Sequence, residues 1–242
     1  MSIHIGIVPD KNRTYCKRLG KPLSYLVEHW FNNMILPTIK KFLNGDYSIL
    51  KNLKKIKEIS LYVSSIDNTK RIDGSLKLGY NLVRKLNYLF YNREKFFKKC
   101  ELEILDSTIK FINEKIDINL IGNREMIPKD VLDIYKKFKK SRDSLFDEKD
   151  VFYINLACCY DPKKDMKYYK NDSVKNDGYT RNQSDIDLIY RTGGQNRLSG
   201  FFPVQTCYSE LIVSDKLWPE TTINDISEAI DKFKRIKRNF GK

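Results

Sequence analysis

The stretch IDLIYRTGGQNRLSGFF, residues 186–202, combines a strand pattern with a binding-loop pattern. Its first five residues are mostly apolar, as in a buried strand. Arg191 follows directly, two glycines allow a tight turn, and Arg197 and Ser199 come shortly afterwards. Ligands of open parallel sheets bind beyond the carboxyl ends of the strands. The stretch therefore predicts a strand that ends in a loop suited to binding an anion.

The rest of the chain alternates strand-like and helix-like segments. Strand-like apolar runs cover residues 3–8, 57–63, 116–122, 151–160, 186–190 and 210–215. Helical periodicity marks residues 23–43, with a kink near Pro37, then 75–113, the segment from Pro128 onward, and 223–242. Residues 161–184 are polar, and we expect a short helix and a mobile loop there. This order predicts an α/β fold with a parallel sheet.

Composition narrows the class of protein. With 242 residues, 41% of them hydrophobic, the chain suits one α/β domain or two small ones and is not expected to be disordered. It has no apolar run of about 18 residues or more, and its start reads as a strand and not as a signal peptide. Its five cysteines form no C-x-x-C pair, so we expect no zinc site and a cytoplasmic location.

The net charge of +14 is compatible with several anionic partners. Most of the excess is lysine spread along helices, which is typical of solvated helix faces. The alternative reading of the same charge is attraction to a polyanion, which could be nucleic acid, an anionic membrane surface or a diphosphate. The sequence contains no nucleic-acid-binding motif, so we expect no nucleic-acid partner.

Polar residues that follow the apolar runs are the candidate site residues. They are Asp10, Lys11, Asn12 and Arg13; Ser65, Asn68 and Arg71; Arg191, Arg197 and Ser199; and Glu210. One arginine side chain can donate two parallel hydrogen bonds to the oxygens of a phosphate. Two carboxylates on different segments, Asp10 and Glu210, can share a Mg²⁺ that bridges to a diphosphate. The set predicts a Mg²⁺-dependent diphosphate site.

Residues 186–220, IDLIYRTGGQNRLSGFFPVQTCYSELIVSDKLWPE, closely resemble the signature of the cis-prenyltransferases, the undecaprenyl diphosphate synthase family. The N-terminal HIGIVPDKNRTYC, the segment YVSSIDNTKRI at 62–72 and the C-terminal AIDKFKRIKRNFG resemble three further family motifs. The resemblance spans nearly the whole chain. It implies a single domain over residues 1–242, with a central, mostly parallel six-stranded sheet surrounded by helices.

The resemblance also implies an activity and roles for residues. The reaction would join isopentenyl diphosphate to a short allylic diphosphate in cis, with Mg²⁺ held by Asp10 and Glu210. Arg191, Arg197 and Ser199 would bind isopentenyl diphosphate. The catalytic set would be Asp10, Asn12, Ser65 and Asn68. A homodimer and a peripheral contact with a membrane are further expectations.

The sequence departs from the family in its first loop. Lys11 stands where the family has glycine, and Thr14 where it has arginine, so we expect Lys11, Arg13 and Arg71 to compensate for the missing cations. Two other readings stay open: head-to-middle coupling of two dimethylallyl diphosphates, and a non-catalytic partner subunit.

Aromatic residues crowd two predicted helices that would flank the product tunnel. Because large rings take up volume that a prenyl chain would need, we expect a product of about two to four isoprene units. The residues concerned are His29, Trp30 and Phe31 on the first helix, and Tyr80, Tyr88, Phe90 and Tyr91 on the second.

Overall fold

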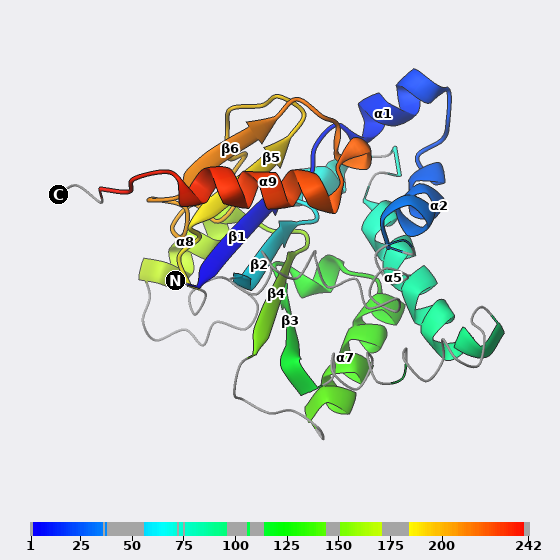
Figure 1. Cartoon of the computed structure of the whole chain (residues 1–242). Helices are drawn as coiled ribbons and strands as arrows, with labels where there is room; N and C mark the ends of the chain where they lie inside the picture. Colours follow the sequence, from blue (N-terminus) through cyan, green and yellow to red (C-terminus); the bar gives the residue numbers. More distant parts are fainter. Residues whose placement is uncertain are drawn as a thin grey trace.

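A six-stranded parallel sheet forms the centre of the molecule, with strand order β3-β4-β2-β1-β5-β6 (Figure 1). The computed structural model describes residues 2–35, 37, 56–71, 73–74, 76–95, 106, 114–143, 151–170 and 184–239. The strands are β1 Ile3–Val8, β2 Ile56–Tyr62, β3 Ile116–Ile121, β4 Phe152–Ala157, β5 Leu188–Thr192 and β6 Glu210–Ser214. The predicted sheet is confirmed.

Helices connect and cover these strands. The α-helices are α1 Asn12–Leu19, α2 Tyr25–Trp30, α5 Lys77–Tyr91, α7 Lys129–Asp143, α8 Pro162–Lys170 and α9 Ile223–Lys234. A π-helical turn, Phe31–Ile35, extends α2, and 3-10 turns lie at Ile66–Lys70, Arg93–Lys95, Arg124–Met126 and Trp218–Glu220. In Figure 1, α9 crosses the sheet over β1 and β5, and α1 and α2 lie beyond the carboxyl end of β1.

Strand β1 is buried on both faces, as expected for a central parallel strand. Ile3, Ile5 and Ile7 point to the α9 side, where they share a core cluster with Ile230 and Phe233. On the opposite face Gly6 leaves room for an aromatic ring, because an added Cβ would lie 2.7 Å from Cε1 of Phe201.

A capping box fixes the start of α9. The Thr222 hydroxyl accepts a hydrogen bond from the Asp225 amide at 3.4 Å, and the Asp225 carboxylate accepts one from the Thr222 amide at 2.8 Å. The buried side of the helix carries Ala229, Ile230 and Phe233, which pack on the sheet. These local signals account for a helix that begins directly after the 3-10 turn.

Several predicted elements differ in extent from those observed. Helix α1 was not predicted, and β5 begins two residues later than the predicted strand 186–190. The predicted helices 23–43 and 75–113 are observed as α2 and α5, and their later parts lie outside the described residues. The predicted mobile loop also falls largely outside them, at 171–183.

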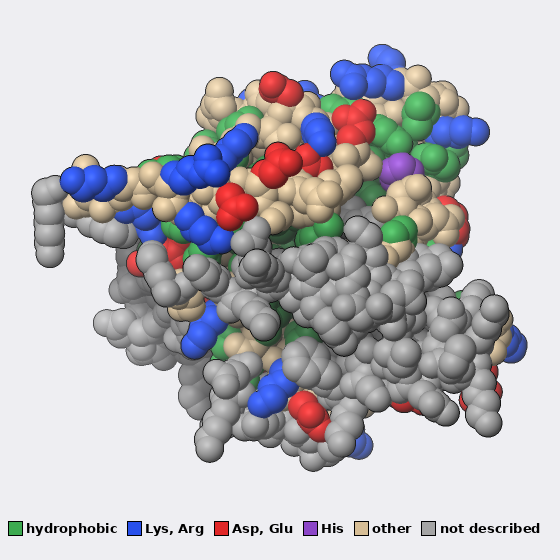
Figure 2. Space-filling model, viewed as in Figure 1, with side chains coloured by type: hydrophobic (Ala, Val, Ile, Leu, Met, Phe, Trp, Pro, Cys, Tyr) green, Lys and Arg blue, Asp and Glu red, His purple; other side chains and the backbone are tan. Residues whose placement is uncertain are grey.

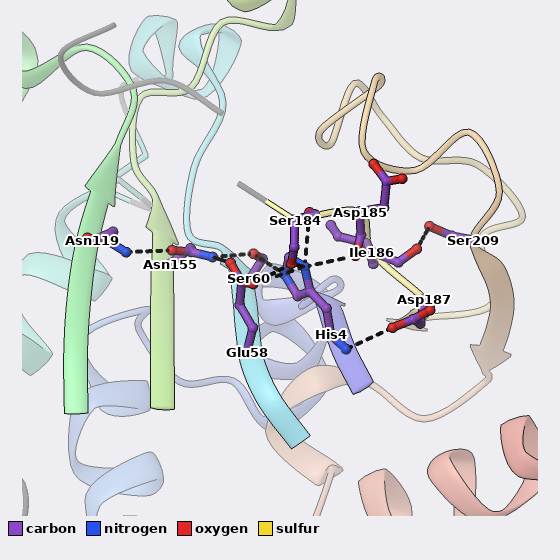
Figure 3. A network of polar contacts seen from close by, with 10 residues as sticks. All are labelled: His4, Glu58, Ser60, Asn119, Asn155, Ser184, Asp185, Ile186, Asp187 and Ser209. Atoms are coloured by element: carbon purple, nitrogen blue, oxygen red, sulfur yellow. Dashed lines mark hydrogen bonds and ion pairs between the residues drawn. The ribbon is translucent and has the colours of Figure 1, made fainter. Parts of the chain in front are cut away.

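A row of buried polar side chains crosses the sheet on the face opposite α9 (Figure 3). His4 Nε2 and the Ser60 hydroxyl form a 2.8 Å hydrogen bond, and the Asn155 amide donates to Ser60 at 3.0 Å and to Glu58 at 2.6 Å. Ser184, at the entrance to β5, contacts both His4 and Glu58. The network joins β1, β2 and β4 to the segment before β5.

Burial lowers the pKa of His4 below its usual value, although Glu58 acts in the opposite direction. A neutral ring with its proton on Nδ1 matches the contacts, because Nδ1 faces the backbone oxygens of Ser184 and Asp185 at 3.2 Å each. His4 is therefore a structural residue in the sheet.

Basic side chains gather at two ends of the visible face. Figure 2 shows Lys and Arg side chains over α1 and over the C-terminal end of α9. The last turn of α1 contributes Lys17 and Arg18, and that of α9 contributes Lys232 and Lys234. Among the described helices, none is long and apolar enough to span a bilayer.

Candidate active site

A cavity of about 400 Å³ opens at the carboxyl ends of β1, β2 and β5. All predicted site residues except Glu210 line it: Asp10, Lys11, Asn12, Arg13, Ser65, Asn68, Arg71, Arg191, Arg197 and Ser199. Because these strands are parallel, the loops that follow them meet at one edge of the sheet. The volume falls within the range of small-molecule sites.

An ion pair joins the two sides of the cavity. Arg191, at the end of β5, is only 2% exposed and donates from Nη2 to the Asp10 carboxylate at 2.8 Å. Its Nη1 donates to the Ser199 hydroxyl at 2.9 Å and to the Arg197 carbonyl. The other Asp10 oxygen accepts from the Lys11 amide at 2.7 Å. Arg191 therefore holds the Asp10 carboxylate and the Ser199 hydroxyl on opposite sides of one guanidinium.

The backbone of the Gly193–Gly194 turn is fixed by the neighbouring loop. The Gly193 amide donates to the Lys216 carbonyl at 2.8 Å, and the Gly194 amide to the Ser214 carbonyl at 3.0 Å. Both glycines have positive φ, 81° and 66°, which side chains other than glycine rarely adopt. The turn therefore presents Arg197 and Ser199 from a rigid frame.

A 3-10 turn after β2 supplies Ser65 and Asn68. The Asn68 side-chain oxygen accepts from the Ser65 amide at 2.8 Å, and the Asn68 amide donates to the Ser65 carbonyl at 3.0 Å. Asn68 thus fixes this loop with its oxygen, and its side-chain NH₂ group keeps donors for a ligand.

The electrostatics of the cavity favour an anion. Five basic side chains and one carboxylate line it, with Asp10 as the carboxylate. Arg13 is 56% exposed and pairs with Asp73 at 3.2 Å. The buried Asn12 side-chain oxygen has no hydrogen-bond partner among the described residues. A cluster of this charge suits phosphate oxygens.

Two residues outside the predicted set support the site. The Thr192 hydroxyl accepts from the Asp10 amide at 2.8 Å. Tyr62 lines the cavity and donates from its hydroxyl to the Ser199 carbonyl at 3.2 Å. Burial raises the pKa of Tyr62 to about 12, so the hydroxyl keeps its proton as a donor. Both residues had a sequence signal, because Thr192 directly follows Arg191 in the polar run after the fifth predicted strand and Tyr62 opens the segment 62–72 that resembles a family motif.

Glu210 lies away from this cavity. It starts β6 and pairs with Leu188, whereas Arg191, next to Asp10, pairs with Val213. Three strand residues separate these positions, which is about 10 Å along the sheet. One chain therefore does not bring Asp10 and Glu210 together, because a residue that opens a parallel strand faces the opposite edge of the sheet.

Magnesium fits the cavity only together with a diphosphate. Among the described residues no group of three or more His, Cys, Asp or Glu side chains could hold a metal ion. Asp10 is a single carboxylate among cations, and Mg²⁺ sites of this kind take one or two carboxylates and complete their shell with substrate phosphates and water. Asp10 is the residue that would hold the ion.

The described aromatic residues divide into buried and exposed sets. Trp30 and Phe31 are buried next to α5, and Tyr80 is buried near the end of β4. Tyr88 and Tyr91 are 55% and 59% exposed, so they do not fill the interior as predicted. The apolar periodicity of α5 did not indicate which of its faces would be buried against the rest of the protein. The side chain of Phe90 lies outside the described part of the chain.

Comparison with known proteins shows the family to which the chain belongs. Residues 47–241 match the family model described as "Putative undecaprenyl diphosphate synthase". The tritrans,polycis-undecaprenyl-diphosphate synthase (geranylgeranyl-diphosphate specific) of Aeropyrum pernix is 31% identical, over 98% of this chain and 97% of that protein. The isoprenyl transferase of Treponema denticola is 26% identical, over 98% and 96%.

Solved structures show the same fold. Lavandulyl diphosphate synthase from Lavandula x intermedia, solved with dimethylallyl diphosphate, aligns with a TM-score of 0.66 at 18% identity, covering 99% of this chain and 98% of the other. A probable undecaprenyl diphosphate synthase from Campylobacter jejuni aligns with a TM-score of 0.63 at 21% identity, covering 100% and 99%. The chain is thus an enzyme of the cis-prenyltransferase type. It belongs to the undecaprenyl diphosphate synthase family.

Proposed function

We propose that the chain joins an allylic diphosphate to isopentenyl diphosphate and forms the new double bond in cis. The observation that carries this proposal is the cavity, where three strand ends bring five cations and one carboxylate together. Such a set suits two diphosphates better than a neutral ligand. The names of the relatives, which include prenyl diphosphate synthases and isoprenyl transferases, support the same reaction.

In this proposal the loop after β5 binds isopentenyl diphosphate. Arg191 and Arg197 donate to its phosphate oxygens, and the Ser199 hydroxyl adds a further hydrogen bond. Arg191 is already oriented by Asp10 and Ser199, so little ordering is needed when the ligand binds.

The allylic diphosphate binds nearer to α1. Lys11, Arg13 and Arg71 compensate its charge as the allylic C–O bond breaks, and Ser65 and Asn68 position the substrate. The double bond of isopentenyl diphosphate attacks the allylic carbon, and a proton then leaves from the new product. Asn12, whose side-chain oxygen has no partner among the described residues, is a further group for orienting the reactants.

When bound at Asp10 with a diphosphate, Mg²⁺ supplies charge neutralisation at the leaving group. The 2.8 Å ion pair with Arg191 holds the Asp10 carboxylate in place at the cavity. Asp10 is therefore the residue whose loss should affect turnover most.

For the product we propose a short chain of about two to four isoprene units. The burial of Trp30, Phe31 and Tyr80 supports this length, because rings in a packed interior leave less room for a growing chain. Tyr88 and Tyr91 are exposed, so these two rings do not restrict the space for a growing chain. The name of the Aeropyrum pernix relative points to a longer product, and chromatography of the dephosphorylated product tests the proposed length.

Head-to-middle coupling of two dimethylallyl diphosphates is a second candidate. The observation that favours it is the changed first loop, in which Lys11 occupies a left-handed conformation. A non-catalytic subunit is a third reading, and the ordered Asp10–Arg191–Ser199 arrangement argues against it.

A homodimer is also proposed. Strand β6 is an edge strand, and its Leu211 is 38% exposed, with Tyr208 just before it at 66%. An exposed edge with apolar side chains is commonly covered by another chain. Sedimentation equilibrium of the purified protein would show a monomer if this proposal is wrong.

The reaction is tested by incubating the purified chain and Mg²⁺ with labelled isopentenyl diphosphate and one of four allylic partners: dimethylallyl, geranyl, farnesyl or geranylgeranyl diphosphate. A further arm contains labelled dimethylallyl diphosphate without isopentenyl diphosphate. A cis-prenyl product in one arm supports the proposal. Product from dimethylallyl diphosphate alone would favour head-to-middle coupling. No product in any arm would favour the non-catalytic subunit.

A further inference from the structure

The loop after β5 has a strained backbone just beyond Arg197. Ser199, Gly200 and Phe202 have φ of 54°, 78° and 39°, all in the left-handed region. This region is unfavourable for residues with a Cβ, and such strain persists only where the surrounding structure enforces it. The packing around the loop therefore decides whether Ser199 keeps the conformation seen here.

Two phenylalanine rings anchor this part of the loop in the core. Phe201 and Phe202 are both 0% exposed, and their rings stack with centroids 4.6 Å apart. The centroid of the Phe201 ring lies 5.1 Å from that of Tyr62, and the centroid of the Phe202 ring lies 5.0 Å from that of Tyr160. The strained backbone is thus attached to two rings that are fixed on several sides.

The Phe201 ring lies against β1 at Gly6, in the middle of the sheet. A Cβ added to Gly6 would lie 2.7 Å from Cε1 of Phe201 and 3.2 Å from Cγ2 of Ile186. Because packed interiors do not stretch, the missing side chain of Gly6 provides the space for the ring. The contact therefore ties the loop after β5 to the strand whose own following loop carries Asp10.

The strained segment presents two oxygens to Arg191. Nη1 of Arg191 donates to the Ser199 hydroxyl at 2.9 Å and to the Arg197 carbonyl. On its other side, the Ser199 carbonyl accepts from the Tyr62 hydroxyl at 3.2 Å. Phe201 follows Ser199 by two residues, so a displaced ring would also displace the hydroxyl that meets Arg191.

We infer that Phe201 is a positioning residue for the diphosphate site: its ring, seated on Gly6, holds Ser199 in the left-handed conformation from which the hydroxyl meets Arg191. Phe201 is fully buried and lies outside the cavity lining, so it acts through Ser199. The inference rests on the proposed function in that the ligand of this loop is isopentenyl diphosphate. Binding of that ligand without an allylic partner requires no turnover.

The test is a double-mutant cycle between Gly6 and Phe201, with affinity measured by titration calorimetry with isopentenyl diphosphate alone. Gly6→Ala displaces the ring and Phe201→Leu removes its outer edge. Each variant should bind about tenfold more weakly, because a charge-assisted hydrogen bond at Ser199 is misplaced. Gly6→Ala/Phe201→Leu should also lose about tenfold and not 100-fold, because the smaller side chain leaves space for the added methyl group.

Phe233→Leu is the matched control, because it shortens another buried ring, in the core under α9 and away from the cavity. Like Phe201→Leu it should lower the Tm, but its affinity should stay within about twofold of that of the unmodified chain, since the two sites are independent. An equal loss of affinity in Phe233→Leu would show a general loosening of the fold and would overturn the inference.

The cycle has further outcomes that contradict the inference. Unchanged affinity in Gly6→Ala and Phe201→Leu, or the full additive loss in the double variant, would show that the ring does not position Ser199. If such results accompany a cis-prenyl product, the inference fails and the proposed function stands. If the coupled loss is found but no allylic diphosphate gives a prenyl product, the proposed function fails and the inference stands. An unmodified chain that does not bind isopentenyl diphosphate would overturn both.

Discussion

The Arg191 guanidinium donates to the Asp10 carboxylate at 2.8 Å, and this pair links the end of β5 to the loop after β1. Arg191 is almost fully buried, whereas the Asp10 side chain is 36% exposed at the cavity. The buried guanidinium therefore fixes the position of the carboxylate at the cavity. The two sides of the cavity therefore depend on each other.

Asp10→Asn should reduce prenyl transfer by about 100-fold or more, because the metal-binding charge is lost at the leaving diphosphate. The amide keeps an oxygen that can accept from Arg191, so thermal unfolding should change little. Steady-state kinetics measure the loss of prenyl transfer, and thermal unfolding followed by circular dichroism measures the change in stability. A variant that is folded and retains near-normal turnover would remove Asp10 from the mechanism.

Tyr62→Phe should raise the KM for isopentenyl diphosphate several-fold, because the hydroxyl that donates to the Ser199 carbonyl is lost. The hydrogen bond is worth about 1 kcal/mol, and Ser199 has a positive φ of 54° that needs support. The KM for the allylic partner should stay nearly constant. Equal changes in both constants would show that Tyr62 does not act through Ser199.

Asp73→Asn should strengthen diphosphate binding, since it releases Arg13 from an exposed ion pair. Exposed pairs are worth about 0–1 kcal/mol, so the gain should be up to about fivefold. Pyrophosphate titration measures it, and Asp67→Asn, which disrupts the exposed pair with Lys70 and lies outside the cavity lining, is the matched control. Weaker binding by Asp73→Asn would mean that the Asp73 carboxylate orders the loop and does not compete with the diphosphate for Arg13.

The strand-end pattern was sufficient to predict most of the charged side chains that line this cavity. Arg191, Arg197 and Ser199 follow a short strand and a Gly-Gly turn, so local sequence determines their positions. Glu210 was predicted to lie with Asp10, but it begins β6 and so lies toward the opposite edge of the sheet within one chain. Its position depends on sheet register, which arises from pairing with β5 across the chain.

Helix α1 escaped prediction for a related reason. Its sequence, NRTYCKRL, has little apolar periodicity, and Cys16 is its buried residue. The helix forms because it packs on α2 and on the turn at Trp218–Glu220, which a local pattern does not reveal. The left-handed Lys11 at its start was equally hidden, since lysine gives no sign of such a backbone.

His4→Gln should make stability less dependent on pH. Burial lowers the pKa of His4 in the folded state, so the unfolded chain binds the proton more readily. The unmodified protein should thus be at full stability above about pH 6.5 and lose stability as pH falls below that value. Urea unfolding at pH 7.5 and 5.5 should show a smaller loss in the variant. An equal loss in both proteins would mean that protonation of His4 does not contribute to the loss of stability at low pH.

Trp30→Ala should lengthen the product if the ring limits chain growth. Trp30 is buried beside Leu26 and Leu78, and removing an indole from a core costs about 3–5 kcal/mol, so the variant needs assay at low temperature. Tyr91→Ala, at an exposed position, is the control and should leave product length unchanged. If the unmodified chain, Trp30→Ala and Tyr91→Ala give products of identical length, Trp30 does not limit the growth of the prenyl chain.

Cis-prenyl transfer is tested most directly by a turnover assay with labelled isopentenyl diphosphate, Mg²⁺ and the best allylic diphosphate, comparing the unmodified chain with Asp10→Asn. Chromatography of the dephosphorylated product against cis and trans standards reports both condensation and geometry. The predicted result is a cis product from the unmodified chain and a loss of about 100-fold or more in the variant. A trans product, no condensation with any allylic diphosphate, or equal turnover by the two proteins would contradict cis-prenyl transfer at this cavity.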